Sequence, residues 1–126
     1  MSFRFLEFRV YKESKMFYQE IQNIIKSFPG EERYALGDQL RRSSLSILLN
    51  IAEGSDRGSD KDFGRFLKNA LGSLNETVAG TDVAHTNKYI DEKIYKKLVT
   101  MADGVSKQLA SFNKRLLLGH KPEAIS

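Results

Sequence analysis

One stretch of the chain decides its fold: residues 39–76 read QLRRSSLSILLNIAEGSDRGSDKDFGRFLKNALGSLNE. Its apolar residues recur every three or four positions, at Leu40, Ile47 and Ile51 in the first half and at Phe63, Leu67 and Leu74 in the second. This spacing is typical of amphipathic helices. The run GSDRGSD at 54–60 has the small and polar residues of a turn. The stretch therefore predicts two consecutive helices joined by a short loop.

The same periodicity continues on both sides of this stretch. Apolar positions at helical spacing run over 10–28, 36–51, 63–84 and 94–116, and the breaks between them fall at Pro29-Gly30, 54–60 and 87–91. Ser59-x-x-Asp62 is typical of a capping box, and Asp91 is a suitable N-cap for the last helix. No segment alternates with the period of two that a strand requires. Four long helices with short connections predict an all-α, antiparallel, up-down-up-down four-helix bundle.

Composition limits the kinds of protein that this chain can be. With 126 residues, of which 40% are hydrophobic, it is long enough for one domain, expected over 1–118 with a short tail at 119–126. The absence of cysteine excludes disulfides, thiolate metal sites and cysteine nucleophiles. No apolar run approaches the roughly 18 residues of a membrane span, and charges interrupt the N-terminal MSFRFLEFRV. We therefore expect a cytoplasmic protein.

The second helix carries more apolar surface than a single bundle needs. Leu45, Leu48, Leu49 and Ala52 extend that surface beyond the core stripe of Leu40, Ile47 and Ile51. One interpretation is a helix packed deeply inside its own bundle. The other is burial on two sides, with Leu45, Leu48 and Leu49 against another subunit. We favour the second, because a helix in a monomeric bundle ordinarily keeps one polar face in water.

Polar residues form two lines at helical spacing. The first consists of Gln39, Arg42, Ser46, Asn50, Glu53 and Arg57, and the second of Arg65, Asn69, Gly72 and Glu76. Such lines suit directional hydrogen bonds between helices or subunits. We expect Asn50, Glu53 and Arg57 to hold the second helix to a neighbouring helix or to the following loop. The alternative is a solvated face with incidental ion pairs.

Basic residues gather on the fourth helix. Lys93, Lys96, Lys97, Lys107, Lys114 and Arg115 lie opposite its apolar stripe. The first 63 residues balance ten bases against ten acids, so the net charge of +4 arises entirely beyond them. A basic stripe of this kind can contact the phosphates of RNA or DNA. It is equally what a solvated outer face looks like, although repetition around an oligomer would enlarge its positive field.

The motifs of common catalytic and metal sites are missing. Asp82-x-x-His85 resembles one half of a di-iron pair, but such bundles need two pairs and two further carboxylates, so a polar pair at a helix end is the better interpretation. The other histidine, His120, lies in the tail. Phosphate-binding and nucleophile-elbow patterns are absent from the sequence. We expect no enzymatic activity, no metal and no cofactor.

The central stretch is also similar to a known family. Residues 39–76 resemble the signature of small four-helix-bundle proteins encoded within intervening sequences of bacterial large-subunit ribosomal RNA genes, a family that includes accessory proteins of diversity-generating retroelements. The most specific parts are Gln39-x-x-Arg42, Asn50-Ile51-Ala52-Glu53-Gly54, Arg57 and Gly72-Ser73-Leu74-x-Glu76. Upstream, VYKES at 10–14 and Phe28-Pro29 match the first helix and the first loop, so that the resemblance spans roughly residues 6–118.

The resemblance implies a barrel-like ring, typically a pentamer, with a basic surface suited to nucleic acid and no established catalysis. One departure is Leu48, where many relatives carry a proline that bends the helix. The second helix is therefore expected to be straighter here.

Two functions remain open at this point. The leading expectation is a homo-oligomeric, non-enzymatic bundle that binds RNA or DNA through backbone charge, with the stripe on the fourth helix as its contact. The alternative is a protein-interaction scaffold that docks a partner such as a reverse transcriptase, without physiological binding of nucleic acid.

Overall fold

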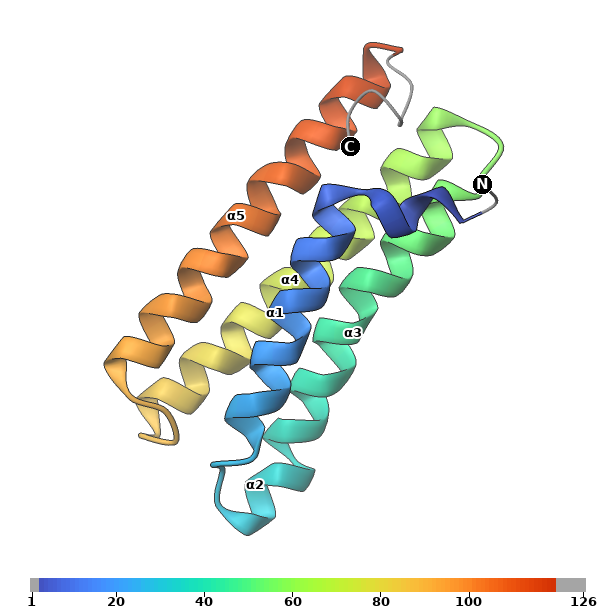
Figure 1. The fold of residues 1–126 in the computed structure, drawn as a ribbon. Coiled ribbons are helices and arrows are strands. Elements are labelled where there is room, and N and C mark those ends of the chain that lie inside the picture. Colours follow the sequence, from blue (N-terminus) through green and yellow to red (C-terminus); the bar gives the residue numbers. More distant parts are fainter. Residues whose placement is uncertain (1–2, 120–126) are drawn as a thin grey trace.

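The computed structural model describes residues 3–119. Its helices are η1 (Arg4–Glu7), α1 (Arg9–Ile25), α2 (Gly30–Tyr34), α3 (Leu36–Ser55), α4 (Asp60–Thr86) and α5 (Glu92–Leu117). Within this part of the chain there is no strand. Figure 1 shows α1, α3, α4 and α5 side by side, each running opposite to the one before it. The predicted four-helix bundle is confirmed.

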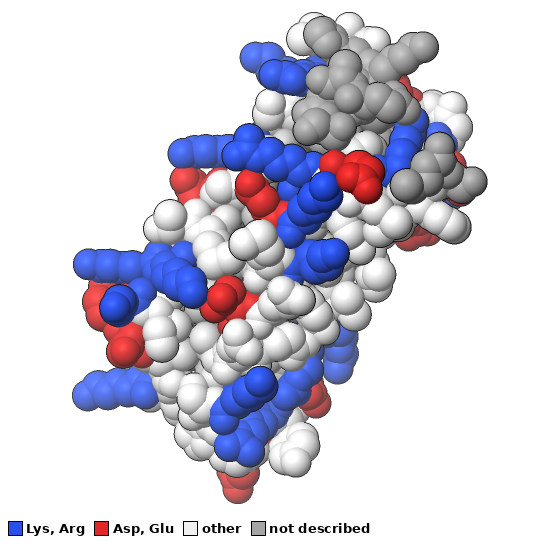
Figure 2. Space-filling model, viewed as in Figure 1, with Lys and Arg blue, Asp and Glu red and all other residues white. Residues whose placement is uncertain are grey.

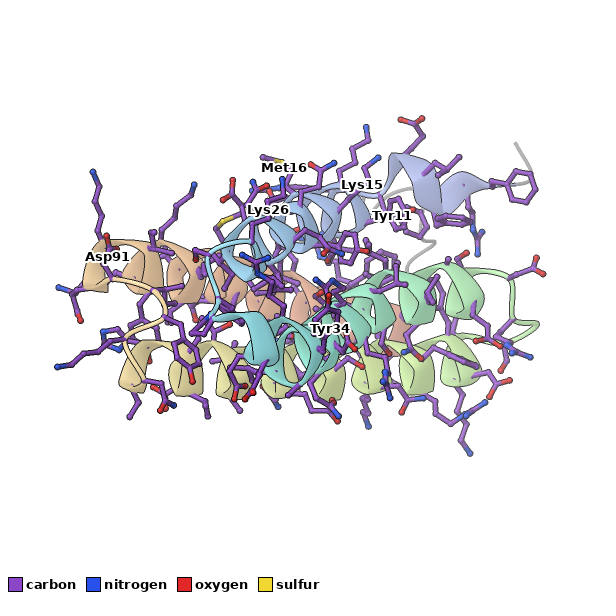
Figure 3. All side chains as sticks on the ribbon, turned by 90° about the horizontal axis from the view of Figure 1, so that it is seen from below. Tyr11, Lys15, Met16, Lys26, Tyr34 and Asp91 are labelled. Carbon is purple, nitrogen blue, oxygen red and sulfur yellow. The ribbon has the colours of Figure 1, made fainter. Side chains whose placement is uncertain are left out.

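The four long helices occupy the corners of the bundle. α1 packs against α3 and α5, and α4 packs against the same two helices. The outer side of α1 carries Lys15 and Met16, which point away from the bundle (Figure 3). α2 is an element that the apolar spacing did not predict; its five residues follow Pro29, and Glu31 and Glu32 in its first turn suit the positive end of a helix.

The helix starts follow the predicted caps. The Ser59 hydroxyl accepts a hydrogen bond from the Asp62 backbone N–H at 3.1 Å at the start of α4. The Asp91 carboxylate accepts one from the Ile94 backbone N–H at 2.8 Å at the start of α5. α3 runs unbroken through Leu48, as the absence of proline there predicts.

One apolar core fills the space between the helices. At one end the ring of Phe112 lies 5.2 Å from the rings of both Phe8 and Phe63, measured between centroids. Along the middle, Ile21 and Ile47 are fully buried, and Leu74 is 1% exposed. All four long helices contribute residues to this core, so detachment of any one of them would expose apolar side chains to water.

α3 and α4 contact each other through small residues. The buried hydroxyls of Ser43 and Thr77 lie 2.7 Å apart, and the Ser73 hydroxyl donates to that of Ser46 at 2.8 Å. Near the end of α3, a Cβ added to Gly54 would stand only 2.7 Å from the Cβ of Phe66. The two helix backbones therefore approach closely, and buried hydroxyls in the contact satisfy one another.

Replacement of Thr77 by Val is expected to lower the free energy of unfolding by about 1–3 kcal/mol, because it leaves the buried Ser43 hydroxyl with only a 3.5 Å contact to the Leu40 carbonyl. Adding Ser43→Ala removes that unsatisfied group. The double variant should therefore lose less stability than the sum of the two single variants. Chemical denaturation of all four proteins measures this coupling, and strict additivity would contradict the contact.

Candidate functional site

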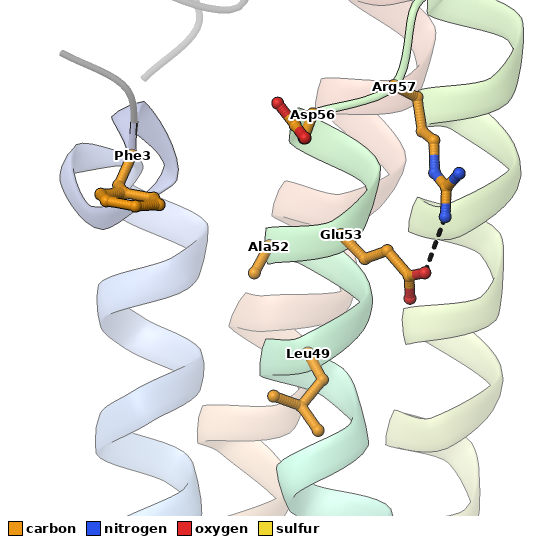
Figure 4. Close-up of a pocket in the computed structure, with 6 residues that line it drawn as sticks. All are labelled: Phe3, Leu49, Ala52, Glu53, Asp56 and Arg57. Carbon is orange, nitrogen blue, oxygen red and sulfur yellow. Dashed lines mark hydrogen bonds and ion pairs between the residues drawn. The ribbon is translucent and has the colours of Figure 1, made fainter.

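The outer face of α3 exposes apolar side chains. Leu45 is 38% exposed and Leu49 is 56% exposed. Leu49 also lines a hollow of about 680 Å³ with Phe3, Ala52, Glu53, Asp56 and Arg57 (Figure 4). Leu48, by contrast, is only 5% exposed, because its own bundle already covers it. The predicted subunit interface is therefore narrowed to Leu45 and Leu49.

The polar line on α3 makes mostly local contacts. The Asn50 amide donates to the Ser46 carbonyl at 2.9 Å within α3. The Arg57 guanidinium donates to the Glu53 carboxylate at 2.7 Å, and it also lies 4.6 Å from the centre of the Phe66 ring on α4. Arg57 lies in the loop after α3, so its bond with Glu53 joins α3 to that loop, as one of the two expectations had it. Of the three residues, only Arg57 also reaches another helix.

The direct polar links between α3 and α4 are instead the serine and threonine hydroxyls. These short side chains lie in the helix contact itself, where no long polar side chain fits. The sequence signal that could have found them is the occurrence of small polar residues three or four positions apart on each helix, Ser43 and Ser46 on α3 and Ser73 and Thr77 on α4.

The remaining members of the two polar lines lie at the surface. Gln39, Arg42, Gly72 and Glu76 are all exposed. Neither Arg42 nor Glu76 forms an ion pair within residues 3–119. These four residues are free to contact another molecule, and they do not stabilise the single chain through polar bonds.

Glu53→Gln is expected to lower the free energy of unfolding by no more than about 1 kcal/mol, because the ion pair with Arg57 is exposed, at 58% for Glu53 and 39% for Arg57. The measurement is a thermal melt at low and at high salt, with Asp103→Asn as the matched exposed pair on α5. A loss of 3 kcal/mol or more, the order expected for a buried pair, would show that another subunit covers Glu53.

All six bases of the predicted α5 stripe are exposed, but they are not equivalent. The ammonium nitrogen of Lys96 lies 3.7 Å from a carboxylate oxygen of Glu92. The same distance is 3.2 Å between Lys97 and Glu20 of α1, and 2.9 Å between Lys107 and Asp103. Lys93, Lys114 and Arg115 form no ion pair in the described part of the chain. Figure 2 shows basic side chains projecting along the α5 side of the bundle with acidic groups between them. Neighbouring carboxylates thus offset half of the stripe.

A second basic group lies in a groove between α4 and α5, and the search for a single stripe missed it. Lys61, Arg65 and Lys68 line this groove from α4, and Lys114 lines it from α5. A sequence signal for it existed: no Asp or Glu occurs from 63 to 75 or from 104 to 119. The structure brings these two acid-free segments together.

The other titratable cluster joins the end of α4 to the start of α5. The His85 imidazole lies 2.7 Å from the Glu92 carboxylate and stacks on the Tyr95 ring, with centroids 4.2 Å apart. The Tyr95 hydroxyl donates to Asp82 at 2.8 Å, and this hydrogen bond raises the pKa of the phenol. Asp82 and His85 are thus polar groups at a helix end, each bonded to α5.

The structure offers no metal site or membrane helix in the region that it covers. Residues 3–119 contain no group of three or more His, Asp and Glu side chains placed to hold a metal ion. None of the described helices is long and apolar enough to cross a bilayer. The remaining histidine, His120, lies outside the described residues.

Comparison with known proteins identifies the family. Residues 6–111 match the family model of the 23S rRNA-intervening sequence proteins. The fold is similar to the crystal structure of a protein of unknown function from the S23 ribosomal protein family of Bacteroides thetaiotaomicron, with 28% sequence identity and a TM-score of 0.77. That match covers 83% of this chain and 98% of the other. Among curated proteins none matches. The chain belongs to the family of 23S rRNA-intervening sequence proteins.

Proposed function

We propose that this protein is a non-enzymatic homo-oligomer, a ring of five copies, that binds RNA or DNA through the phosphate backbone. The observation that carries the proposal is the outer face of α3. There Leu45 and Leu49, which lie between the family motifs Gln39-x-x-Arg42 and Asn50-Ile51-Ala52-Glu53-Gly54, are 38% and 56% exposed. The bases of α4 and α5 that form no ion pair within residues 3–119 supply the contact with nucleic acid.

The exposed leucines support self-association. Complete burial of a fully exposed leucine side chain contributes about 1.5–3 kcal/mol. Leu45 and Leu49 still expose 38% and 56% of their surface, so covering each would contribute about half of that. Arg42 at one end of the face and Glu53 and Asp56 at the other are charged groups suited to the rim of an interface. A contact between two different faces of the subunit closes into a ring when the rotation from copy to copy adds up to one full turn, and the proposal of five copies requires such a contact.

Self-association strengthens the case for nucleic acid. Each copy carries a net charge of +4, so a ring of five would carry about +20. A field of that size attracts polyanions and raises their association rate, most strongly at low salt. Beside the bases of α4, the Phe66 ring is only 7% exposed, with the guanidinium groups of Arg57 and Arg65 4.6 and 4.7 Å from its centre, so it offers no open face to a base. We therefore propose recognition of backbone charge and not of base sequence.

A salt titration tests this function. Affinity of the wild-type protein for structured RNA and for random-sequence duplex DNA is measured from about 50 to 200 mM salt. We expect log K to fall linearly with log salt, with a slope near −0.9 per phosphate contacted on duplex DNA and near −0.7 on single strands. An affinity that does not change with salt concentration would contradict recognition of the phosphate backbone. No binding at about 50 mM salt contradicts the function and favours the protein scaffold.

A further inference from the structure

The groove between α4 and α5 has a basic rim and an apolar floor. Two adjoining hollows, of about 510 and 240 Å³, share Lys68, Asn113 and Leu117. The second hollow is also lined by Leu67, Leu71 and Leu109. Leu117, the last residue of α5, is 71% exposed. The groove thus joins positive charge to an exposed apolar surface.

Three of the four basic side chains that line the groove are not paired with an acid within residues 3–119. Lys61, Lys68 and Lys114 form no ion pair among the described residues. Asp62 is the one acid lining either hollow, and it lies 3.2 Å from Arg65. Lys68 and Lys114 line the same hollow from opposite helices, so that an anion in the hollow would lie between two positively charged side chains.

Near the start of α5, by contrast, acidic side chains lie close to the bases. Lys96 and Lys97 lie near Glu92 and Glu20, and Asp91 and Asp82 add further negative charge around the start of the helix. A phosphate approaching Lys97 would have to compete with a carboxylate that is already 3.2 Å from its ammonium group. The groove, whose one lining acid already lies 3.2 Å from Arg65, is the more favourable place for a phosphate.

We propose that a single strand of nucleic acid lies along the α4–α5 groove, with its phosphates on Lys61, Lys68 and Lys114. This inference rests on the proposed function and names the site and the ligand class within it. Lys61 and Lys68 are seven residues apart on α4, or about 10 Å along the helix, which spans several phosphates of one strand.

The apolar floor favours a single strand over a duplex. An unpaired base has an exposed face that can lie against Leu117 and Leu71, whereas a duplex stacks its bases inside and presents only phosphates and groove edges. A duplex is a rod with a convex surface, and the outside of the bundle is convex as well. The two would therefore meet at the groove along a single line. The Asn113 amide, on the same floor, is placed to bond a base edge or a sugar.

Two matched triple variants test the site. Lys61→Glu/Lys68→Glu/Lys114→Glu changes the groove, and Lys96→Glu/Lys97→Glu/Lys107→Glu makes the same change in charge at three α5 bases that lie beside Glu92, Glu20 and Asp103. Affinity for a labelled oligo(dT) of about 20 nucleotides is measured by fluorescence anisotropy against salt, around the 0.15 M at which the Debye length is about 8 Å. Circular dichroism and sedimentation check that both variants fold and assemble as the wild type does.

We expect the groove variant to lose at least tenfold in affinity and to flatten the slope of log K against log salt by about 2, which is three phosphate contacts at about 0.7 each. The control variant should lose less than threefold and keep the wild-type slope. Wild-type affinity for oligo(dT) should exceed that for a duplex of the same length.

The other outcomes overturn the inference in distinguishable ways. Equal losses of affinity in the two variants, or a larger loss in the control, would overturn the groove as the site. The nucleic acid would then contact the control positions of α5, or be attracted only by the net positive charge of the protein. Tighter binding of duplex than of single strand would overturn the ligand class. A wild type that binds neither oligonucleotide, but does bind an acidic amphipathic peptide in a manner that the groove variant abolishes, would make the groove a protein-docking site and reject the proposed function as well.

Discussion

Leu45→Glu combined with Leu49→Glu is expected to convert the oligomer into folded monomers. Both side chains are exposed in the single chain, at 38% and 56%, so carboxylates there remain in water and leave the core intact. In an assembly the same positions would place two charges per copy inside an apolar contact, and an unpaired buried charge costs several kcal/mol. Sedimentation equilibrium measures the mass, and circular dichroism confirms the helices.

The matched control adds the same two charges elsewhere. Thr100→Glu with Ser111→Glu alters two exposed positions of α5 and should leave the mass unchanged. If the α3 variant keeps the wild-type mass, then this face is not the interface. If the control also dissociates, the effect is general repulsion and says nothing in favour of α3.

Gly54→Ala is expected to lower the free energy of unfolding by about 1–3 kcal/mol and Tm by roughly 4–10 °C. The added Cβ would stand 2.7 Å from the Cβ of Phe66 and 3.0 Å from Cδ1 of Phe63, and neither contact can be relieved by rotating the end of a flexible side chain. The helices α3 and α4 would have to move apart. Thermal melts at a fixed protein concentration measure the effect.

Gly104→Ala provides the control for this substitution. Gly104 lies inside α5, and nothing stands within 4 Å of the position of its missing Cβ. Alanine there should stabilise the protein by about 0.5–1 kcal/mol through helix propensity alone. If Gly54→Ala is neutral or stabilising as well, the close approach of α3 and α4 at Gly54 is not required.

The fold was predictable from the sequence because its signals are local. The apolar spacing gave the four long helices, and the side chains of Ser59 and Asp91 marked the starts of two of them correctly. α2 was missed because a single turn of helix is too short to show a period. The sequence does not show which glycines are needed for close packing of helices. Only the packed structure distinguishes Gly54, which faces Phe66, from Gly104, which faces open space.

The candidate site was predictable only in part because it depends on what lies next to each residue in space. The exposure of Leu45 and Leu49 agrees with the second apolar side expected for this helix, whereas Leu48 fills the bundle's own interior. The lysines of α5 were grouped by one helical wheel, which cannot show that Glu20 of α1 lies beside Lys97. Nor can it show that Lys61 and Lys68 of α4 line a groove with Lys114.

The most direct test of the central claim is the mass of the wild-type protein in solution. Sedimentation equilibrium at micromolar concentration should give one species whose mass is a whole multiple of the 14.3 kDa chain, about 72 kDa for five copies. That result would mean that a surface of each copy is covered by another, as proposed for the exposed leucines of α3. A species of 14.3 kDa across the whole concentration range would contradict the account.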